Sequence, residues 1–323
     1  MHIPDGMIDA KVAVATAALG AGGLGLALRR ARIDRSPRRV PLMGLAAAFV
    51  FAAQMLNFPV IAGTSGHLVG AVLATVLLGP SAAMVVISAV LIVQCLMFND
   101  GGVTALGANI FNMAILGCAV GFAIYHPLAC LFPGRRGQIL AASFAGWCTT
   151  VLSAVMCAAE ISTSGKASWS KALPALAGIH MLIGIGEGLI TAIVLVSIAR
   201  LRPELVPDNS PIASSPPRYA VAVAYGLLIS LGLALFVSPL ASKSPDGLES
   251  VAQKHDFAEK PTDQPLLRAP IPDYKMPGIS STALATSIAA AAGTLIVFGL
   301  SFVLARILVP SATPPTEINP HAR

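Results

Sequence analysis

The sequence predicts an all-α polytopic membrane protein, with seven helices in a first module, two in a second, and the N-terminus outside. Of its 323 residues, 55% are hydrophobic and only 11% are charged, whereas soluble domains average about 25% charged residues. Apolar residues form blocks of about 20, enough to cross a hydrocarbon core of about 30 Å. The runs are continuous and do not alternate, which excludes an outer-membrane barrel.

The apolar blocks define the expected membrane spans. They lie near residues 9–28, 40–57, 67–79, 82–98, 105–125, 139–160, 172–199, 219–240 and 283–305. The third block is short and flanked by glycine, so we expect a partial or tilted helix there. The first is no cleavable signal peptide, because its basic cluster follows the apolar run instead of preceding it.

Arginine placement predicts the orientation. The densest basic loop contains Arg29, Arg30, Arg32, Arg35, Arg38 and Arg39. By the positive-inside rule this loop is cytoplasmic, which places the N-terminus outside. The formal net charge of +6 therefore indicates topology and not a nucleic-acid surface.

Composition divides the chain into two modules. Residues 1–200 hold seven spans, and residues 201–218 are polar and proline-rich, as expected for a cytoplasmic linker. Residues 219–309 hold two spans around a polar outer loop that contains the pentapeptide PDGLE at 245–249. Residues 310–323 are expected to be a disordered tail.

The first residues, MHIPDG, offer a chelating group. Bulky His2 should prevent removal of Met1, so the terminal amine, the His2 amide and the His2 imidazole provide three nitrogens in sequence. These nitrogens close adjacent five- and six-membered rings, and a fourth would complete the square-planar geometry expected for Ni(II) or Cu(II). The competing interpretation is that His2 is an ordinary exposed terminal residue.

The predicted topology supplies a fourth nitrogen. The loop NFPVIAGTSGH at residues 57–67 lies on the same outer face as the N-terminus, and it ends in His67. Its glycine, threonine and serine residues allow it to bend back into the protein. We therefore expect His67 to meet the N-terminal chelate.

Four motifs resemble one known family. They are MHIPDG at the start, NFPVIAGTSGHLVG at 57–70, GANIFNMAILG at 107–117 and HMLIGIGEGLIT at 180–191. In this order they resemble the NikM/CbiM substrate-binding S components of energy-coupling-factor (ECF) transporters for nickel and cobalt. The second module, with PDGLE, resembles the accessory subunit NikN/CbiN, and a fused arrangement is typical of NikMN proteins.

The resemblance implies a metal site and partners. It implies four nitrogen ligands from Met1, His2 and His67, with Ni(II), or alternatively Co(II) for cobalamin biosynthesis, bound as substrate and no cofactor. It also implies a membrane coupling T subunit (NikQ/CbiQ-like), a cytoplasmic ATPase subunit (NikO/CbiO-like) and a place in the bacterial inner membrane. The chain would then be the substrate-capture component of an ECF-type ABC importer.

Other polar residues admit two interpretations each. Asn99, Asn109 and Asn112 either orient the ligands from a second shell or form plain helix–helix hydrogen bonds. His180 and Glu187 share one helical face, as an interior polar contact or, less favoured, a proton relay. A strip of small residues either docks the coupling subunit or packs within this chain: Ala13, Ala17, Ala21 and Gly25.

The sequence argues against an enzyme. No G-x-x-x-x-G-K-[ST] phosphate loop occurs, so the chain cannot hydrolyse ATP by that route, and a partner ATPase would fit as the source of energy. A secondary metal transporter remains an alternative, although among acidic and basic residues only Glu187 and His180 lie away from the ends of the predicted spans. A catalytic metal would need an open coordination position, which four nitrogens around a planar ion do not leave.

Overall fold

The computed structural model describes residues 2–33, 39–61, 63–202, 219–255, 257 and 267–308. Met1, most of the predicted linker at 201–218 and the predicted tail at 310–323 lie outside the described residues. The described chain is mostly helical, and its only sheet pairs two short strands.

The N-terminal module contains helices of very different length. They are α1 (Ala10–Ile33), α2 (Arg39–Gln54), α3 (Ala71–Leu78), α4 (Pro80–Phe98), α5 (Leu106–Asn109), the π-helix η1 (Ile110–Leu116), α6 (Gly117–Leu131), α7 (Arg135–Thr163) and α8 (Trp169–Leu201). A hairpin of β1 (Phe58–Pro59) and β2 (Ser65–Gly66) lies between α2 and α3.

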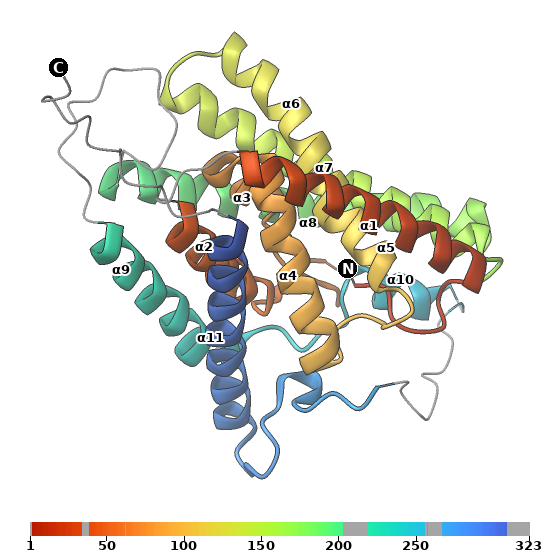
Figure 1. The fold of residues 1–323 in the computed structure, drawn as a ribbon. Helices are drawn as coiled ribbons and strands as arrows, with labels where there is room; N and C mark the ends of the chain where they lie inside the picture. Colours follow the sequence, from red (N-terminus) through yellow and green to blue (C-terminus); the bar gives the residue numbers. More distant parts are fainter. Residues whose placement is uncertain are drawn as a thin grey trace, which may run out of the picture.

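The C-terminal module is built around two long segments. The first is α9 (Tyr219–Gly232), continued by η3 (Leu233–Val237) and η4 (Ser238–Leu240), and the second is α11 (Thr282–Leu308). Between them lie α10 (Gly247–Lys254) and the short helix η5 (Pro272–Tyr274). Both α9 and α11 pack on α2, so the two modules share one body (Figure 1).

Among the described residues, seven helical segments are long and apolar enough to cross a membrane. They match the predicted spans except the second and third. The span predicted at 40–57 is a shorter apolar helix, Val40–Gln54. The one predicted at 67–79 contains only the eight residues of α3, about 12 Å long at 1.5 Å per residue, which confirms that this helix is partial.

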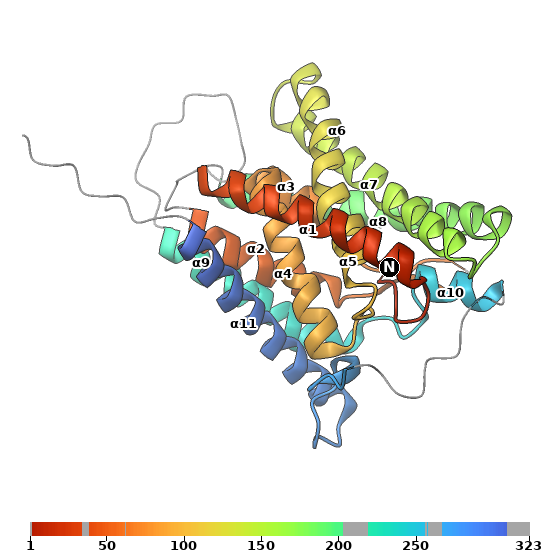
Figure 2. The same cartoon turned by 45° about the vertical axis from the view of Figure 1, so that its right-hand side comes forward.

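Helix α4 occupies the centre of the molecule, and α1 lies at its edge. In the apolar window of α4, 72% of the residues are buried, compared with 17% in α1. Figure 2 shows α4 between α1 on one side and α11 on the other. The C-terminal end of α4 therefore lies deep in the assembly of both modules, where Phe98 is fully buried.

Candidate metal centre

The N-terminal segment is fixed to α5 and to the loop between α4 and α5. Asn109 Oδ1 accepts a hydrogen bond from the Ile3 amide at 2.8 Å, and Asn109 Nδ2 donates to the Ile3 carbonyl at 3.1 Å. The Gly102 amide donates to the same carbonyl at 2.8 Å. Because Ile3 is also buried, the adjacent His2 has a defined position.

Two glycines let the N-terminal segment approach this loop. Gly101 has φ +89°, a backbone conformation that residues other than glycine rarely adopt. A Cβ on Gly102 would collide with the backbone of Pro4 and Asp5. Two residues after Ile3, Asp5 Oδ1 accepts hydrogen bonds from Thr104 N at 2.8 Å and Thr104 Oγ1 at 2.6 Å. The N-terminal segment is therefore held at Ile3 and again at Asp5.

His67 follows the β1–β2 hairpin and precedes α3. Its position is set from α8, because the Glu187 carboxylate accepts from the amides of Val69 at 2.6 Å and Gly70 at 2.9 Å. Gly70 is left-handed (φ +76°) and is the N-cap of α3. Glu187 therefore makes a buried polar contact that anchors the loop carrying His67. This agrees with the interior polar contact that the sequence favoured over a proton relay.

The two histidines lie against each other. The His2 and His67 rings are stacked, with centroids 5.3 Å apart and planes inclined by 14°. His67 Nδ1 lies 3.0 Å from the Leu68 carbonyl, a contact that favours the proton on Nδ1 and the lone pair on Nε2. His2 Nδ1 lies 3.1 Å from Asp100 Oδ1, and its Nε2 is buried without a hydrogen-bond partner.

Burial and charge set the ionisation of this group. Burial lowers the pKa of the His67 imidazole to about 3, so the ring is neutral, as a metal ligand must be. Burial alone would raise the pKa of the Asp100 carboxyl, but the His2 imidazole and the Tyr274 hydroxyl lower it below its usual range. Asp100 is therefore an anion next to His2.

The PDGLE segment lies directly on the histidine loop. The Ser65 amide donates to the Pro245 carbonyl at 2.9 Å, and Ser65 Oγ donates to the Ser244 carbonyl at 2.8 Å. Thr64 and Ser250 share a hydroxyl hydrogen bond of 2.7 Å. In both ribbon views α10 lies beside the N-terminus (Figures 1 and 2). The C-terminal module thus contacts the loop that carries His67.

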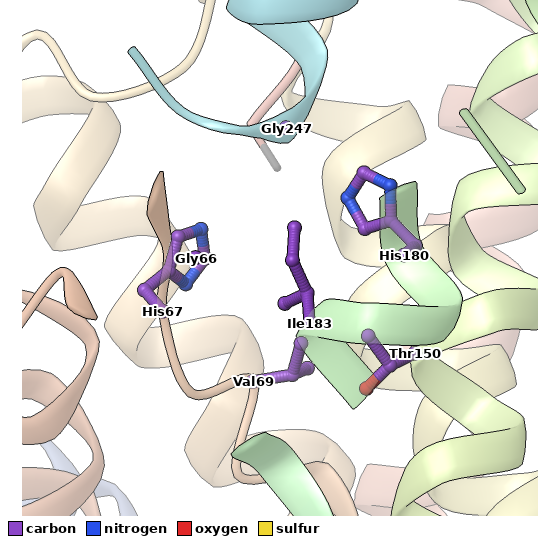
Figure 3. A pocket seen from close by; sticks show the side chains of 7 residues that line it. All are labelled: Gly66, His67, Val69, Thr150, His180, Ile183 and Gly247. Atoms are coloured by element: carbon purple, nitrogen blue, oxygen red, sulfur yellow. The ribbon is translucent and has the colours of Figure 1, made fainter. Parts of the chain in front are cut away.

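A small cavity opens beside His67, with a volume of about 10 Å³, close to what one water molecule needs. Its lining residues are Gly66, His67, Val69, Thr150, His180, Ile183 and Gly247. Figure 3 shows His67 and His180 on opposite sides, with Ile183 between them. His180 Nδ1 lies 2.8 Å from the Leu176 carbonyl of its own helix.

Comparison with known proteins decides the family. Residues 2–205 match the CbiM family, described as the cobalt uptake substrate-specific transmembrane region, and residues 221–309 match the PDGLE domain. The chain belongs to the CbiM family. It is a multi-pass membrane protein with a fused PDGLE domain.

Individual relatives agree with this assignment. The chain is 39% identical to a putative fused nickel transport protein NikMN of Archaeoglobus fulgidus, over 95% of this chain and 98% of that protein. It is 33% identical to cobalt transport protein CbiM 1 of Pelobacter propionicus, over 63% and 93%. A crystal structure of a transition metal transporter matches with TM-score 0.57 and 30% identity, covering 62% of this chain and 93% of that one.

In this CbiM-family chain, the predicted site residues are placed as follows. His2 and His67 are brought together, whereas Met1 lies outside the described residues. Asn109 holds the backbone next to His2. The Asn112 side chain instead donates to Glu160 at 2.8 Å, a helix–helix contact. Asn99 is the left-handed residue that ends α4, with φ 59°.

The predicted small-residue strip on α1 lies largely at the surface. Ala17 approaches α5 closely, because a Cβ on Gly107 would collide with it. Ala17, Ala21 and Gly25 are nevertheless exposed, and Ala13 is half-buried. Most of the strip is therefore open at the surface of the described chain.

Sequence reasoning missed Asp100 and Tyr274. Asp100 was detectable, since it is the only acid in the loop between the fourth and fifth predicted spans. Among the described residues, no group of three or more His, Cys, Asp or Glu side chains could hold a metal ion.

Proposed function

We propose that this chain captures a divalent transition-metal ion, preferentially Ni(II), and that its cargo is bound by nitrogen atoms of the N-terminus and His67. The four donors would be the terminal amine, the His2 amide, His2 Nδ1 and a His67 ring nitrogen. Four nitrogens suit the planar coordination that Ni(II) favours. Binding through the amide requires loss of its proton.

The stacked contact of His2 with His67 carries the proposal. Two imidazoles distant in sequence are held together by separate anchors, Asn109 for the N-terminal segment and Glu187 for the loop. Only Nδ1 of His2 can close a six-membered ring with the His2 amide. In the structure this atom contacts Asp100, so binding requires the ring to turn or to leave Asp100.

Membership of the CbiM family gives the general role of the chain, which is a nickel or cobalt transport component and not an enzyme. We propose further that it delivers its ion within an ECF-type importer, with a membrane coupling subunit and a cytoplasmic ATPase of the NikQ and NikO kinds. The sequence has no phosphate loop of its own. Preference for nickel over cobalt is supported by the fused architecture shared with the Archaeoglobus protein named as a nickel transporter.

A competition experiment tests the substrate and the ligands. Detergent-purified protein is equilibrated with equal Ni(II) and Co(II), and bound metal is counted by mass spectrometry. We expect about one Ni(II) per chain and loss of metal in His2→Gln and His67→Gln. His126→Gln is the matched control, because His126 packs on Phe122 of its own helix. Full metal in either ligand variant would refute the site, and bound cobalt in place of nickel would change the substrate.

A further inference from the structure

A chain of hydrogen bonds joins the C-terminal module to His2. Tyr274 Oη donates to Asp100 Oδ2 at 2.5 Å, and Asp100 Oδ1 lies 3.1 Å from His2 Nδ1. Tyr274 belongs to η5 in the C-terminal module, whereas Asp100 follows α4 in the N-terminal module. One carboxylate thus connects the accessory module with a candidate metal ligand.

Aromatic packing fixes the Tyr274 ring. It is stacked on Phe98, with ring centroids 4.7 Å apart and planes inclined by 15°. Its centroid also lies 6.2 Å from that of the Phe51 ring, which is tilted against it. The adjacent backbone is also tied down, since the Ile271 amide donates to the Met97 carbonyl at 2.9 Å. Packing against the C-terminal end of α4 therefore holds the Tyr274 hydroxyl in a defined position.

The backbone at this point is held in an unfavourable conformation. Asp273 and Tyr274 have φ values of 53° and 54°, in the left-handed region that non-glycine residues, and bulky ones above all, seldom occupy. Such conformations persist only where the surroundings enforce them, and they gather at functional sites. Here the enforced geometry directs the Tyr274 hydroxyl at Asp100.

We propose that Tyr274 is a positioning residue for the metal centre, which holds Asp100 so that its second oxygen stays in place as the partner of the His2 imidazole. The inference rests on the proposed function, because it requires His2 to be a ligand. It gives the fused C-terminal module a defined contribution to the site, through one hydroxyl group.

The buried His2 Nε2 shows how this works. It has no hydrogen-bond partner, while Nδ1 is taken by Asp100. A half-turn of the ring about Cβ–Cγ exchanges Nδ1 with Cδ2 and Nε2 with Cε1, which brings Nε2 towards Asp100. Nδ1 then becomes available to the metal, and its ring keeps a carboxylate partner, as ligating histidines commonly do. Tyr274 keeps the acceptor in place for both orientations.

Tyr274→Phe tests the role of the hydroxyl while keeping the ring on Phe98. We expect roughly tenfold weaker Ni(II) affinity, in the range for residues that support a ligand, and an altered d–d circular dichroism spectrum of the bound ion. Asp100→Asn should weaken binding by about 10- to 100-fold. Tyr225→Phe, on the exposed surface of α9, is the matched control and should bind as the unmodified chain does.

A double-variant cycle separates positioning from general stability. If Tyr274 acts through Asp100, the Asp100→Asn, Tyr274→Phe double variant should bind no more weakly than Asp100→Asn alone, since coupled residues are not additive. Additive losses, or an unchanged affinity and spectrum in Tyr274→Phe, would overturn the inference. If His2→Gln holds as much metal as the unmodified chain, the proposed function itself fails, and this inference fails with it.

Discussion

Asn109 and Glu187 act at the scale of single residues, because each holds backbone beside one histidine. Asn109 makes a two-way hydrogen bond with Ile3, next to His2. Glu187 accepts from two consecutive amides just after His67. Neither side chain needs to touch a metal ion to determine where the two imidazoles lie.

Asn109→Ala removes both hydrogen bonds to Ile3 and leaves a buried amide without its acceptor. We expect a loss of about 1–3 kcal/mol in unfolding free energy and weaker Ni(II) binding, measured by thermal unfolding and by titration. Ser197→Ala is the control, because Ser197 bonds only to its own helix on an exposed face. Unchanged metal affinity in Asn109→Ala would contradict this role.

Metal binding should strengthen as pH rises from 6 to 8. The amine, with an ordinary pKa of about 7.7–8.0, and the His2 amide must both release protons. His67 should not contribute to this profile, because burial lowers its pKa to about 3 and it is already neutral. Ni(II) dissociation constants measured across this range test the prediction, and an affinity independent of pH would argue against amine and amide ligation.

At the scale of elements, the site depends on α8 and the PDGLE segment as much as on the loop that carries His67. Helix α8 supplies Glu187, and residues 244–245 bond to Ser65 of β2. Gly247 lies against His180 and Ile183 of α8, where a Cβ would come within 2.6 Å and 2.9 Å of their side chains. Three segments distant in sequence therefore meet around His67.

Glu187→Gln leaves one carbonyl oxygen where two carboxylate oxygens accepted. One of the buried amides of Val69 and Gly70 then loses its partner, at a cost of about 1–3 kcal/mol, and Ni(II) affinity should fall. Glu160→Gln is the comparison, since Glu160 contacts Asn112 and not the His67 loop. Equal metal affinity in the two variants would show that Glu187 does not support the site.

Gly247→Ala should displace the PDGLE segment from the cavity beside His67. We expect weaker metal retention, measured by the rate at which a chelator removes Ni(II). Gly299→Ala in α11 adds the same methyl group where no atom lies within 4 Å, and it should have no effect. If Gly247→Ala retains metal normally, close contact of this segment is not needed for binding.

At the scale of the whole molecule, the sequence predicts much of the fold and part of the site. Length and hydropathy suffice for α4 and α7, because a membrane span needs a long apolar run. Chelate chemistry and the predicted topology together predict that His2 meets His67. They do not predict the contact of Tyr274 with Asp100, since that contact depends on how η5 packs on α4. For Asn112 the sequence left a ligand-orienting role and a helix–helix hydrogen bond open, and its side chain bonds to Glu160 because η1 directs it towards α7.

In the proposed site the free N-terminus supplies part of the metal coordination. We would count Ni(II) and Co(II) by mass spectrometry, after equal exposure, in the chain with its native N-terminus and in one with a few residues added before Met1. We expect about one Ni(II) per native chain and little metal in the extended one, with unfolding temperatures similar in both. Equal metal in the two forms would contradict the N-terminal chelate.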